Sequence, residues 1–249
     1  MTLELQLATM SRQGGRKYNE DACGHWHSAG RLCCVLADGA GGHGGGDKAS
    51  KLAVENILGL FAAESGASAP LIERLIIDTN RAIIRHRADD RSVQNMYSTA
   101  VALVVDLDAA TVAWGHCGDS RLYLFRQGRI VVRTRDHSLV QSLVDGGMLA
   151  VEEMRSHPQR SELLSALGVA EEDLQVALSE EGWRLQPGDV VMLCTDGLWE
   201  YVDDPELEST LAEAPDARAW MKALEQLVLQ AAVRKPRHDN FTAMTIWVR

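Results

Sequence analysis

Residues 97–134, with the sequence YSTAVALVVDLDAATVAWGHCGDSRLYLFRQGRIVVRT, decide the fold class of this 249-residue chain. Short polar or glycine-containing turns separate four apolar runs here, at residues 100–105, Thr111–Cys117, Arg121–Arg126 and 130–132. Strands so close together predict antiparallel hairpins, because a crossover between parallel strands needs a longer connection. This block therefore predicts antiparallel sheet.

The flanking sequence adds strands and helices in separate blocks. Leu3, Leu5 and Leu7 alternate with polar residues, and residues 31–37 form a short apolar run, so both segments predict strands. Two helices are predicted after Asp47 and after Pro70, and residues 139–181 predict short helices and loops. Another strand, a helix around Trp220 and a final strand at Phe241–Val248 complete the pattern. Segregated strands and helices favour an α+β sandwich of antiparallel sheets.

Composition narrows the class of protein. The 249 residues predict a single domain, and 46% hydrophobic residues are enough for a substantial core. A net charge of −10 argues against a partner with a polyanionic surface, so neither nucleic acid nor a membrane is expected. No apolar run approaches the roughly 20 residues of a membrane span. Five cysteines without a paired motif indicate buried thiols in a reducing cytoplasm.

Aspartates follow several predicted strands. Asp38-Gly39 and Asp196-Gly197 each end an apolar run, Asp119 follows a third, and Asp239 precedes the last. A turn-forming role explains any one of them. Several such carboxylates brought together would repel one another, and a cluster of hard divalent cations would make them tolerable. Asp21 lies near enough in sequence to join them.

A glycine-started loop carries Arg16, whose planar guanidinium could bind a phosphate group. A surface arginine is otherwise simply solvated. The glycine-rich run 39–46 lacks the spacing of known nucleotide-binding loops, so it is interpreted as flexible access to the metal site.

Eight sequence blocks occur in the order found in the type 2C, metal-dependent protein Ser/Thr phosphatases, and the chain resembles the compact bacterial branch of that family. The blocks are Arg16-x-x-Asn19-Glu20-Asp21, Ala37-Asp38-Gly39-x-Gly41-Gly42-His43, Ser98-Thr99-Ala100, Gly118-Asp119-Ser120-Arg121, Asp136-His137-Ser138, Gly188-Asp189-Val190, Cys194-Thr195-Asp196-Gly197-Leu198-Trp199 and Asp239-Asn240-Phe241-Thr242. Together they extend over nearly the whole chain. One such block alone would mean little.

The resemblance implies a four-layer α-β-β-α sandwich, with two central antiparallel sheets and metals at one edge. By position, Asp38 resembles the carboxylate that bridges two Mn²⁺ or Mg²⁺ ions, and the Gly39 carbonyl resembles a ligand of the second ion. Asp196 and Asp239 resemble ligands of the first ion, and Asp21 resembles a ligand that holds the second ion through water. Asp119 resembles a residue that, together with Asp196, holds a weaker third ion. Arg16 matches the arginine that binds the substrate phosphate.

The implied activity is hydrolysis of phosphoserine and phosphothreonine by attack of metal-bound water or hydroxide, without a covalent phosphoenzyme. The expected partners are phosphorylated proteins, including a bacterial Ser/Thr kinase or its substrates, and the expected state is a cytoplasmic monomer. Two alternatives stay open. One is a catalytically silent phosphatase-like signalling module, and the other is a two-metal phosphoesterase that acts on small molecules.

Histidines and cysteines receive structural interpretations. Ala40 stands where many eukaryotic relatives have a histidine, so the proton donor is unassigned, and His43 is interpreted as a loop residue with a structural hydrogen bond. His137 is expected to cap and orient the turn into the next helix. Cys117 and Cys194 are expected to pack in the core, and oxidative inactivation through them is the alternative.

Residues 139–182 resemble the family's variable flap beside the active site. They contain nine acidic and two basic side chains, and so account for most of the net charge of −10. A flap with this charge predicts a preference for substrates that have basic residues near the phosphorylated one.

Overall fold

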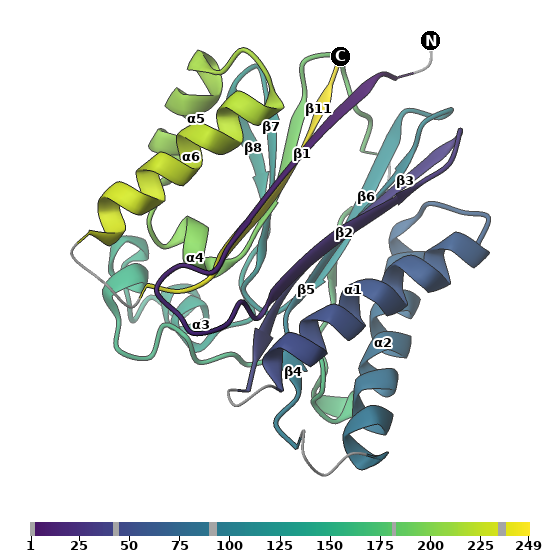
Figure 1. Ribbon diagram of the computed structural model, residues 1–249, viewed down its shortest axis with the longest axis vertical. Helices are drawn as coiled ribbons and strands as arrows, with labels where there is room; N and C mark the ends of the chain where they lie inside the picture. The colour runs from purple at the N-terminus through teal and green to yellow at the C-terminus, as the bar shows by residue number, and fades with distance from the viewer. Residues whose placement is uncertain (1–2, 42–44, 90–93, 181–182, 234–237) are drawn as a thin grey trace.

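Two antiparallel sheets face each other in the computed structural model, and helices cover the outer face of each sheet (Figure 1). The structure describes residues 3–41, 45–89, 94–180, 183–233 and 238–249. The layers run helix, sheet, sheet, helix, which confirms the predicted α+β sandwich.

The first sheet has the strand order β1-β11-β10-β7-β8, and each neighbouring pair is antiparallel. Its strands are β1 (Leu5–Arg12), β7 (Arg121–Arg126), β8 (Arg129–Arg133), β10 (Val190–Cys194) and β11 (Phe241–Val248). Although β1 and β11 are far apart in the sequence, they lie side by side, with Leu5 opposite Val248.

The second sheet has the order β2-β3-β5-β6-β9, and the short strand β4 also pairs with β3. Its strands are β2 (Asp21–His27), β3 (Arg31–Ala40), β4 (Tyr97–Ser98), β5 (Ala100–Asp106), β6 (Thr111–Cys117) and β9 (Ala177–Leu178). The predicted hairpin across Gly118-Asp119 was wrong, because β6 and β7 belong to different sheets and the chain crosses from one sheet to the other there. The 97–134 block is therefore divided between the two sheets.

Long helices cover both outer faces. Helices α1 (Gly46–Ala63) and α2 (Ala69–Asp89) pack on the second sheet, and α5 (Asp204–Glu213) and α6 (Ala217–Ala232) pack on the first (Figure 1). The remaining helices are short: α3 (Leu139–Asp145), α4 (Asp196–Trp199) and the 3₁₀ helices η2 (Val151–Ser156) and η3 (Glu171–Asp173).

The central strands are apolar without interruption because both of their faces are buried. In β5, Ala102 and Val104 pack beneath α1 and α2, whereas Leu103 and Val105 pack between the two sheets. In β7, Phe125 faces α6, and Leu122 and Leu124 face the other sheet. A four-layer sandwich thus needs three layers of core, and the described residues form three such clusters.

Strand β2 and helices α4 and α5 were not predicted from the sequence, and the short strand β9 lies in a segment that was predicted to form helices and loops. Strand β2 reads DACGHWH and is half-buried for most of its length, so it lacks the apolar signal of the central strands. Helix α5 is the shortest of the four helices on the outer faces, and the capping box between Asp203 and Glu206 that begins it was not recognised in the sequence.

The chain ends lie together at one end of the sandwich, as Figure 1 shows, and the loop from β1 to β2 lies at the opposite end with α4. At that end β2 begins, β3 ends and β11 begins. Side chains at these strand ends therefore come close to one another across both sheets. Within the described part of the chain, no helix has the length and apolar character needed to span a membrane.

Trp220 tests the packing of α6. Its side chain is fully buried, it meets the Phe125 ring edge-on with ring centroids 5.3 Å apart, and its Nε1 donates to Thr210 Oγ1 (3.1 Å). We expect Trp220→Ala to lower the free energy of unfolding by about 3–5 kcal/mol, because it removes the largest side chain of this layer and leaves a cavity. Urea unfolding measures the change.

Leu229→Ala on the same helix is the control, because Leu229 is 42% exposed and its loss should change stability by no more than about 0.5 kcal/mol. Equal losses in the two variants would contradict the observed packing.

Candidate metal centre

Asp21 and Asp38 lie directly opposite each other where β2 begins and β3 nears its end. The next pair along the ladder is hydrogen-bonded, because the Gly39 N–H donates to the Glu20 carbonyl (3.1 Å). Asp21 and Asp38 therefore form a non-hydrogen-bonded pair, the kind in which opposite side chains come closest. Like charges in such a pair repel each other.

Thr195 joins this pair to the other sheet. Its Oγ1 donates to Asp21 Oδ2 (3.0 Å) and accepts from the Thr242 N–H (3.0 Å), so one hydroxyl connects β2 with the start of β11. The second oxygen of the Asp21 carboxylate, Oδ1, is buried without a hydrogen-bond partner. Burial raises the pKa of Asp21 to about 7, and the hydroxyl hydrogen bonds oppose that rise.

Asp196 follows strand β10 and begins the single turn of α4, with Thr195 as the preceding N-cap residue. Its Oδ1 is also buried without a hydrogen-bond partner. Burial raises the pKa of Asp196 well above its ordinary value, and the charges of Asp119 and Asp239 raise it further. A buried carboxylate oxygen without a donor is free to bind a cation.

Asp119 lies in the turn between β6 and β7. Gly118 precedes it with φ +94°, and a Cβ there would lie 2.6 Å from Thr99 Cγ2, so this position requires glycine. The Trp199 Nε1 donates to the Asp119 carbonyl (2.9 Å) and fixes the turn against α4. Burial raises the pKa of Asp119 to about 7, with Asp136 adding to the rise and Arg121 opposing it.

Gly39 brings two chain segments unusually close to Asp38. A Cβ at this position would lie 2.1 Å from the Gly46 carbonyl oxygen and 2.7 Å from the Glu20 carbonyl oxygen. Only glycine fits between them. The start of α1 thus packs directly against the end of β3.

Asn240 fixes the loop that carries Arg16. Its Nδ2 donates to the carbonyls of Gln13 (2.6 Å) and Tyr18 (2.8 Å), and its Oδ1 accepts from the Glu20 N–H (2.8 Å). The Arg16 guanidinium forms an ion pair with Asp239, although about half of the Arg16 side chain stays exposed. Arg16 and Asp239 are therefore in contact at the rim of the carboxylate cluster.

The structure brings together the carboxylates that the sequence singled out. Burial raises the pKa of Asp38, and the charges of four other aspartates add to the rise in the order Asp21, Asp196, Asp119 and Asp239. The described residues include no group of three His, Cys, Asp or Glu side chains already arranged around a common metal position. The donors are all oxygens, however, and two of them are buried and unpaired, which fits hard cations such as Mn²⁺ or Mg²⁺.

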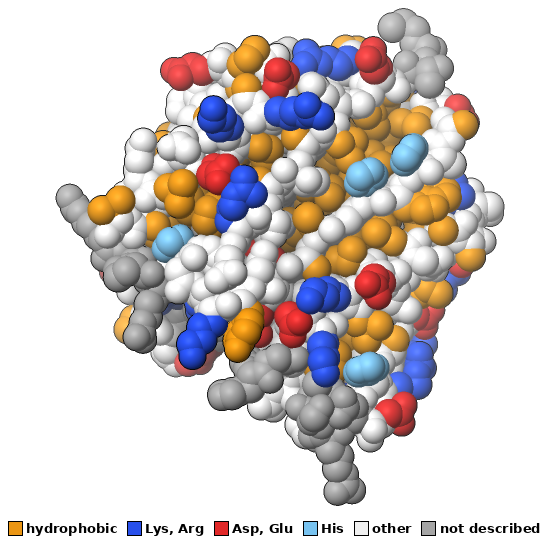
Figure 2. Space-filling view, viewed as in Figure 1, with side chains coloured by type: hydrophobic (Ala, Val, Ile, Leu, Met, Phe, Trp, Pro, Cys, Tyr) orange, Lys and Arg blue, Asp and Glu red, His pale blue; other side chains and the backbone are white. Residues whose placement is uncertain are grey.

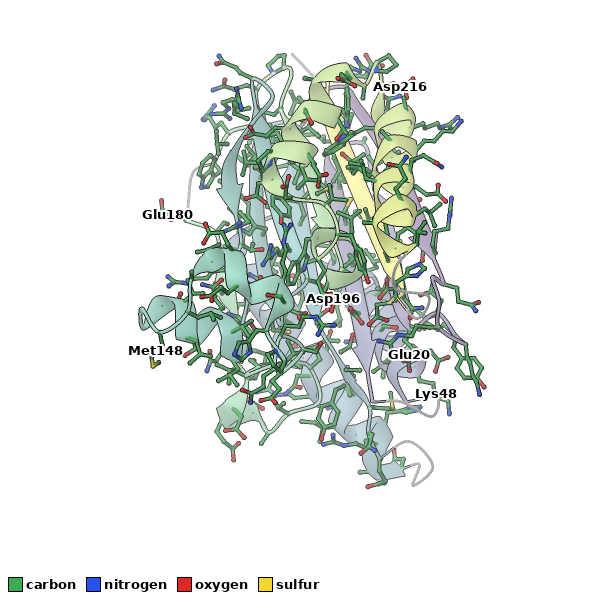
Figure 3. The ribbon with its side chains drawn as sticks, turned by 90° about the vertical axis from the view of Figure 1, so that its left-hand side faces the viewer. Glu20, Lys48, Met148, Glu180, Asp196 and Asp216 are labelled. Atoms are coloured by element: carbon green, nitrogen blue, oxygen red, sulfur yellow. The ribbon has the colours of Figure 1, made fainter. Side chains whose placement is uncertain are left out.

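Asp196 and Glu20 lie at the same end of the sandwich in Figure 3, whereas Met148 marks the outer tip of the α3 segment, away from Glu20. The segment of residues 139–160, which begins with α3, contacts the chain beside α4 through one ion pair. Arg160 Nε donates to Glu200 Oε1 (2.7 Å), and Glu200 directly follows α4.

The prediction that His137 caps the following helix was wrong. Ser138 is the N-cap residue of α3 and accepts from the Gln141 N–H (3.2 Å). The His137 ring instead accepts from the Gly118 N–H (3.4 Å) and stacks on His116 with ring centroids 4.8 Å apart. Burial lowers the pKa of His137 to about 4, so the ring is neutral at pH 7. His43 lies outside the described residues.

Cys117 and Cys194 are confirmed as core residues, whereas Cys23 is only partly buried. Cys117 packs beneath α1 and α2, and Cys194 packs in the core layer beneath α5 and α6. Both side chains are fully buried, and burial raises the pKa of the Cys117 thiol to about 12 and that of Cys194 further. Because the thiolate is the reactive form, these environments disfavour the oxidation alternative. Trp199 packs in the same core layer as Cys194.

Sequence reasoning missed the roles of Thr195 and Asn240. Both residues stand next to candidate ligands, Asp196 and Asp239, and this position in the sequence could have indicated that they support the site. Their partners are far away in the sequence, because Asn240 bonds to the loop at residues 13–20 and Thr195 bonds to Asp21.

Comparisons with known proteins agree with the geometry. The family model described as protein phosphatase 2C matches residues 10–235. The chain is 32% identical over 246 residues to the serine/threonine protein phosphatase PstP of Mycobacterium tuberculosis, and the match covers 98% of this chain. It covers 45% of that relative, so the chain spans about half the length of PstP.

Two solved structures are similar over their whole length. One is described as PppA, a key regulatory component of T6SS in Pseudomonas aeruginosa, with TM-score 0.80, 30% identity and coverage of 100% of this chain and 99% of that chain. The other is the catalytic domain of PstP in complex with two manganese ions, with TM-score 0.81, 28% identity and coverage of 99% of both chains.

The clustered carboxylates predict how stability depends on pH when cations are removed. The raised pKa values mean that the folded chain binds protons more tightly than the unfolded chain does. In EDTA, we expect the thermal midpoint to be highest below about pH 4, near the ordinary pKa of 3.8, and to fall as the pH rises through about 7. Thermal unfolding monitored by circular dichroism across this range measures the effect.

Asp21→Asn provides the matched variant, since an amide carries no charge. In EDTA it should unfold at a higher temperature than the unchanged chain at pH 7, and the difference should shrink toward pH 4. If the two pH profiles run parallel, the repulsion of these carboxylates does not control stability.

Proposed function

Because the chain belongs to the protein phosphatase 2C family, we propose that it hydrolyses phosphoserine and phosphothreonine in proteins with bound divalent cations. One observation carries the proposal: Asp38 lies within electrostatic reach of four other aspartates, and two buried oxygens of the cluster have no hydrogen-bond donor. The relatives support the same activity, since PstP is named a serine/threonine protein phosphatase.

We propose that five carboxylates and one carbonyl hold the cations. Asp38 would bridge two ions and the Gly39 carbonyl would join the second. The remaining assignments are Asp196 and Asp239 to the first ion, Asp21 to the second through water, and Asp119 with Asp196 to a third. The two manganese ions in the PstP structure support a two-ion site, and the oxygen donors suit Mg²⁺ as well as Mn²⁺. When bound, such cations lower the pKa of a water molecule and neutralise charge on a phosphoryl group.

Arg16 is the proposed ligand of the substrate phosphate. Its side chain is 51% exposed and reaches the edge of the cluster through its contact with Asp239. Asn240 holds the backbone on both sides of Arg16 by its bonds to Gln13 and Tyr18, so the guanidinium starts from a fixed position. A positioned guanidinium orients a phosphate and stabilises the charge of its oxygens.

Residues 139–182 are proposed to form a flap of a single catalytic domain that extends over residues 1–249, although residues 181 and 182 lie outside the described part. Several acids of this segment are already engaged. Glu171 pairs with Arg81 (2.5 Å), and Asp145 pairs with Arg135. Glu152, Glu172 and Glu180 are exposed, and no ion pair engages them in the described residues. These three acids are among those available to a basic substrate.

The proposed partners are phosphorylated proteins, including a bacterial Ser/Thr kinase or its substrates, and the proposed state is a monomer in the cytoplasm. Bacterial relatives named as serine/threonine phosphatases support this setting. A silent signalling module and a phosphoesterase for small molecules are the alternatives that an activity assay separates.

Asp38→Asn tests the catalytic assignment. We expect the unchanged chain to hydrolyse a phosphothreonine peptide with Mn²⁺ and to lose that activity in EDTA. The variant should lose about a hundredfold or more in kcat, because the bridging carboxylate is the centre of the proposed site. Release of inorganic phosphate is the measurement, and Asp78→Asn on the exposed face of α2 is the matched control. Full activity in EDTA or in Asp38→Asn would overturn the mechanism, and inactivity of the unchanged chain with every cation would favour the silent module.

The flap charge predicts substrate selectivity. Replacing Glu152, Glu172 and Glu180 together by Gln should lower the kcat/KM ratio between a basic-flanked and an acidic-flanked phosphothreonine peptide by about threefold, the effect of losing exposed charge attraction. The matched control replaces Glu55, Glu73 and Glu213, which are exposed on other helices. Peptide selectivity that is unchanged in the flap variant, or equally changed in the control, would refute a role of the flap charge.

A further inference from the structure

Strand β1 leaves one backbone edge unpaired. It is the end strand of its sheet, and within the described residues only β11 pairs with it. The Arg249 N–H donates to the Glu4 carbonyl (2.9 Å), which fixes the alternation of the ladder. The backbone groups of Gln6 and Ala8 therefore face β11, and those of Leu7 and Thr9 point away from it.

A cavity of about 570 Å³ opens beside this edge, between β1, β2 and α6. Leu7, Met10 and Met221 provide apolar side chains, and His25 closes the side formed by β2. Figure 2 shows a strip of hydrophobic side chains along the direction of β1 and β2, with Lys and Arg side chains along the margin over α6. We call this feature the β1 groove.

The rim of the β1 groove is basic, although the whole chain has a net charge of −10. Arg218 and Lys222 are exposed on successive turns of α6, and no ion pair engages either one in the described residues. Arg12 is held beside them by two hydrogen bonds to Glu225 (2.6 and 3.0 Å). An acidic ligand therefore meets complementary charge here.

The β1 groove leads toward the candidate metal centre. Arg12 is the last residue of β1, and the loop that follows carries Arg16 and is held by Asn240. A chain lying along β1 thus runs from the groove to the loop that carries the proposed phosphate ligand.

We propose that the β1 groove binds an extended acidic segment of the phosphoprotein substrate, away from the phosphorylated residue. The segment adds a strand to the free edge of β1, places apolar side chains in the cavity and directs carboxylates to Arg218 and Lys222. The inference rests on the proposed phosphatase function, because it assigns the ligand to a substrate.

A second copy of the chain fits the groove less well. Pairing β1 with β1 of another copy about a twofold axis brings the same surface to face itself. Arg218 and Lys222 would then approach the same basic residues of the other copy, and like charges oppose that contact.

Two phosphothreonine peptides test the proposal. Both have the same phosphorylated core, and the longer one continues through a Gly-Ser linker into a segment of alternating Val and Glu. We expect the extension to lower KM about tenfold with little change in kcat, since one or two net hydrogen bonds and a charge contact suffice for that gain. A linked segment of alternating Val and Lys should give no such gain.

Thr9→Pro removes an outward-facing N–H without disturbing the ladder to β11, because proline is tolerated at a solvent-facing edge. Arg218→Glu combined with Lys222→Glu reverses the rim charge. Each variant should abolish the KM gain of the extended peptide and leave hydrolysis of p-nitrophenyl phosphate unchanged. Arg85→Glu, on the exposed face of α2, is the matched control and should keep the gain.

Equal KM values for the short and extended peptides, or a gain that survives both groove variants, would overturn the proposal. So would a dimer in sedimentation experiments that Thr9→Pro abolishes, because the edge would then belong to a second copy. Binding of the unphosphorylated Val-Glu segment, followed by fluorescence anisotropy, tests the groove separately from catalysis. If the segment binds but no phosphopeptide is hydrolysed with any cation, the proposed function fails and the groove does not.

Discussion

Asp21 and Asp38 repel each other at close range, and the backbone prevents them from moving apart. They form a directly opposed pair in the β2–β3 ladder, and the adjoining Gly39–Glu20 hydrogen bond locks the register. The charge of the pair can be neutralised only by a proton or by a cation. Burial and the neighbouring aspartates raise the pKa of both groups, so a proton is retained more readily than in water. The other features of this end of the molecule either maintain that arrangement or respond to its charge.

The sandwich supplies the rigidity that such a cluster needs. Strands β3 and β5 are buried on both faces, and a shift of one residue would exchange the side chains of two different core layers. Thr195 then connects the sheets at the site by bonding to Asp21, and Asn240 connects the Arg16 loop to β11. The candidate site therefore takes its precision from strand ends and from two polar residues, rather than from the loops themselves.

The sequence predicted the parts of the structure that local patterns control. The runs at 97–134 identified four strands and the β5–β6 and β7–β8 hairpins, because short turns leave few alternatives, but they could not show that β6 and β7 belong to different sheets. Asp38, Asp119, Asp196 and Asp239 were found because each one adjoins an apolar run, and Asp21 was included because it lies near them in the sequence. Strand β2 was not predicted because it lies at the edge of its sheet, and apolar and polar residues alternate only weakly along its sequence. The bonds of Thr195 and Asn240 could not be predicted, since their partners lie more than 170 residues away in the sequence.

On the proposed assignment, the distribution of charge also connects cation binding with phosphate binding. A phosphate that approaches Asp38 without cations meets several carboxylates, and Arg16 is engaged with Asp239. If Asp239 holds a cation as proposed, its carboxylate would no longer be available to Arg16, and the repulsion among the carboxylates would be reduced. Without that ion pair, the Arg16 guanidinium would be able to turn toward an incoming phosphate and bind it. On this assignment, the ion pair between Asp239 and Arg16 would couple cation binding to phosphate binding.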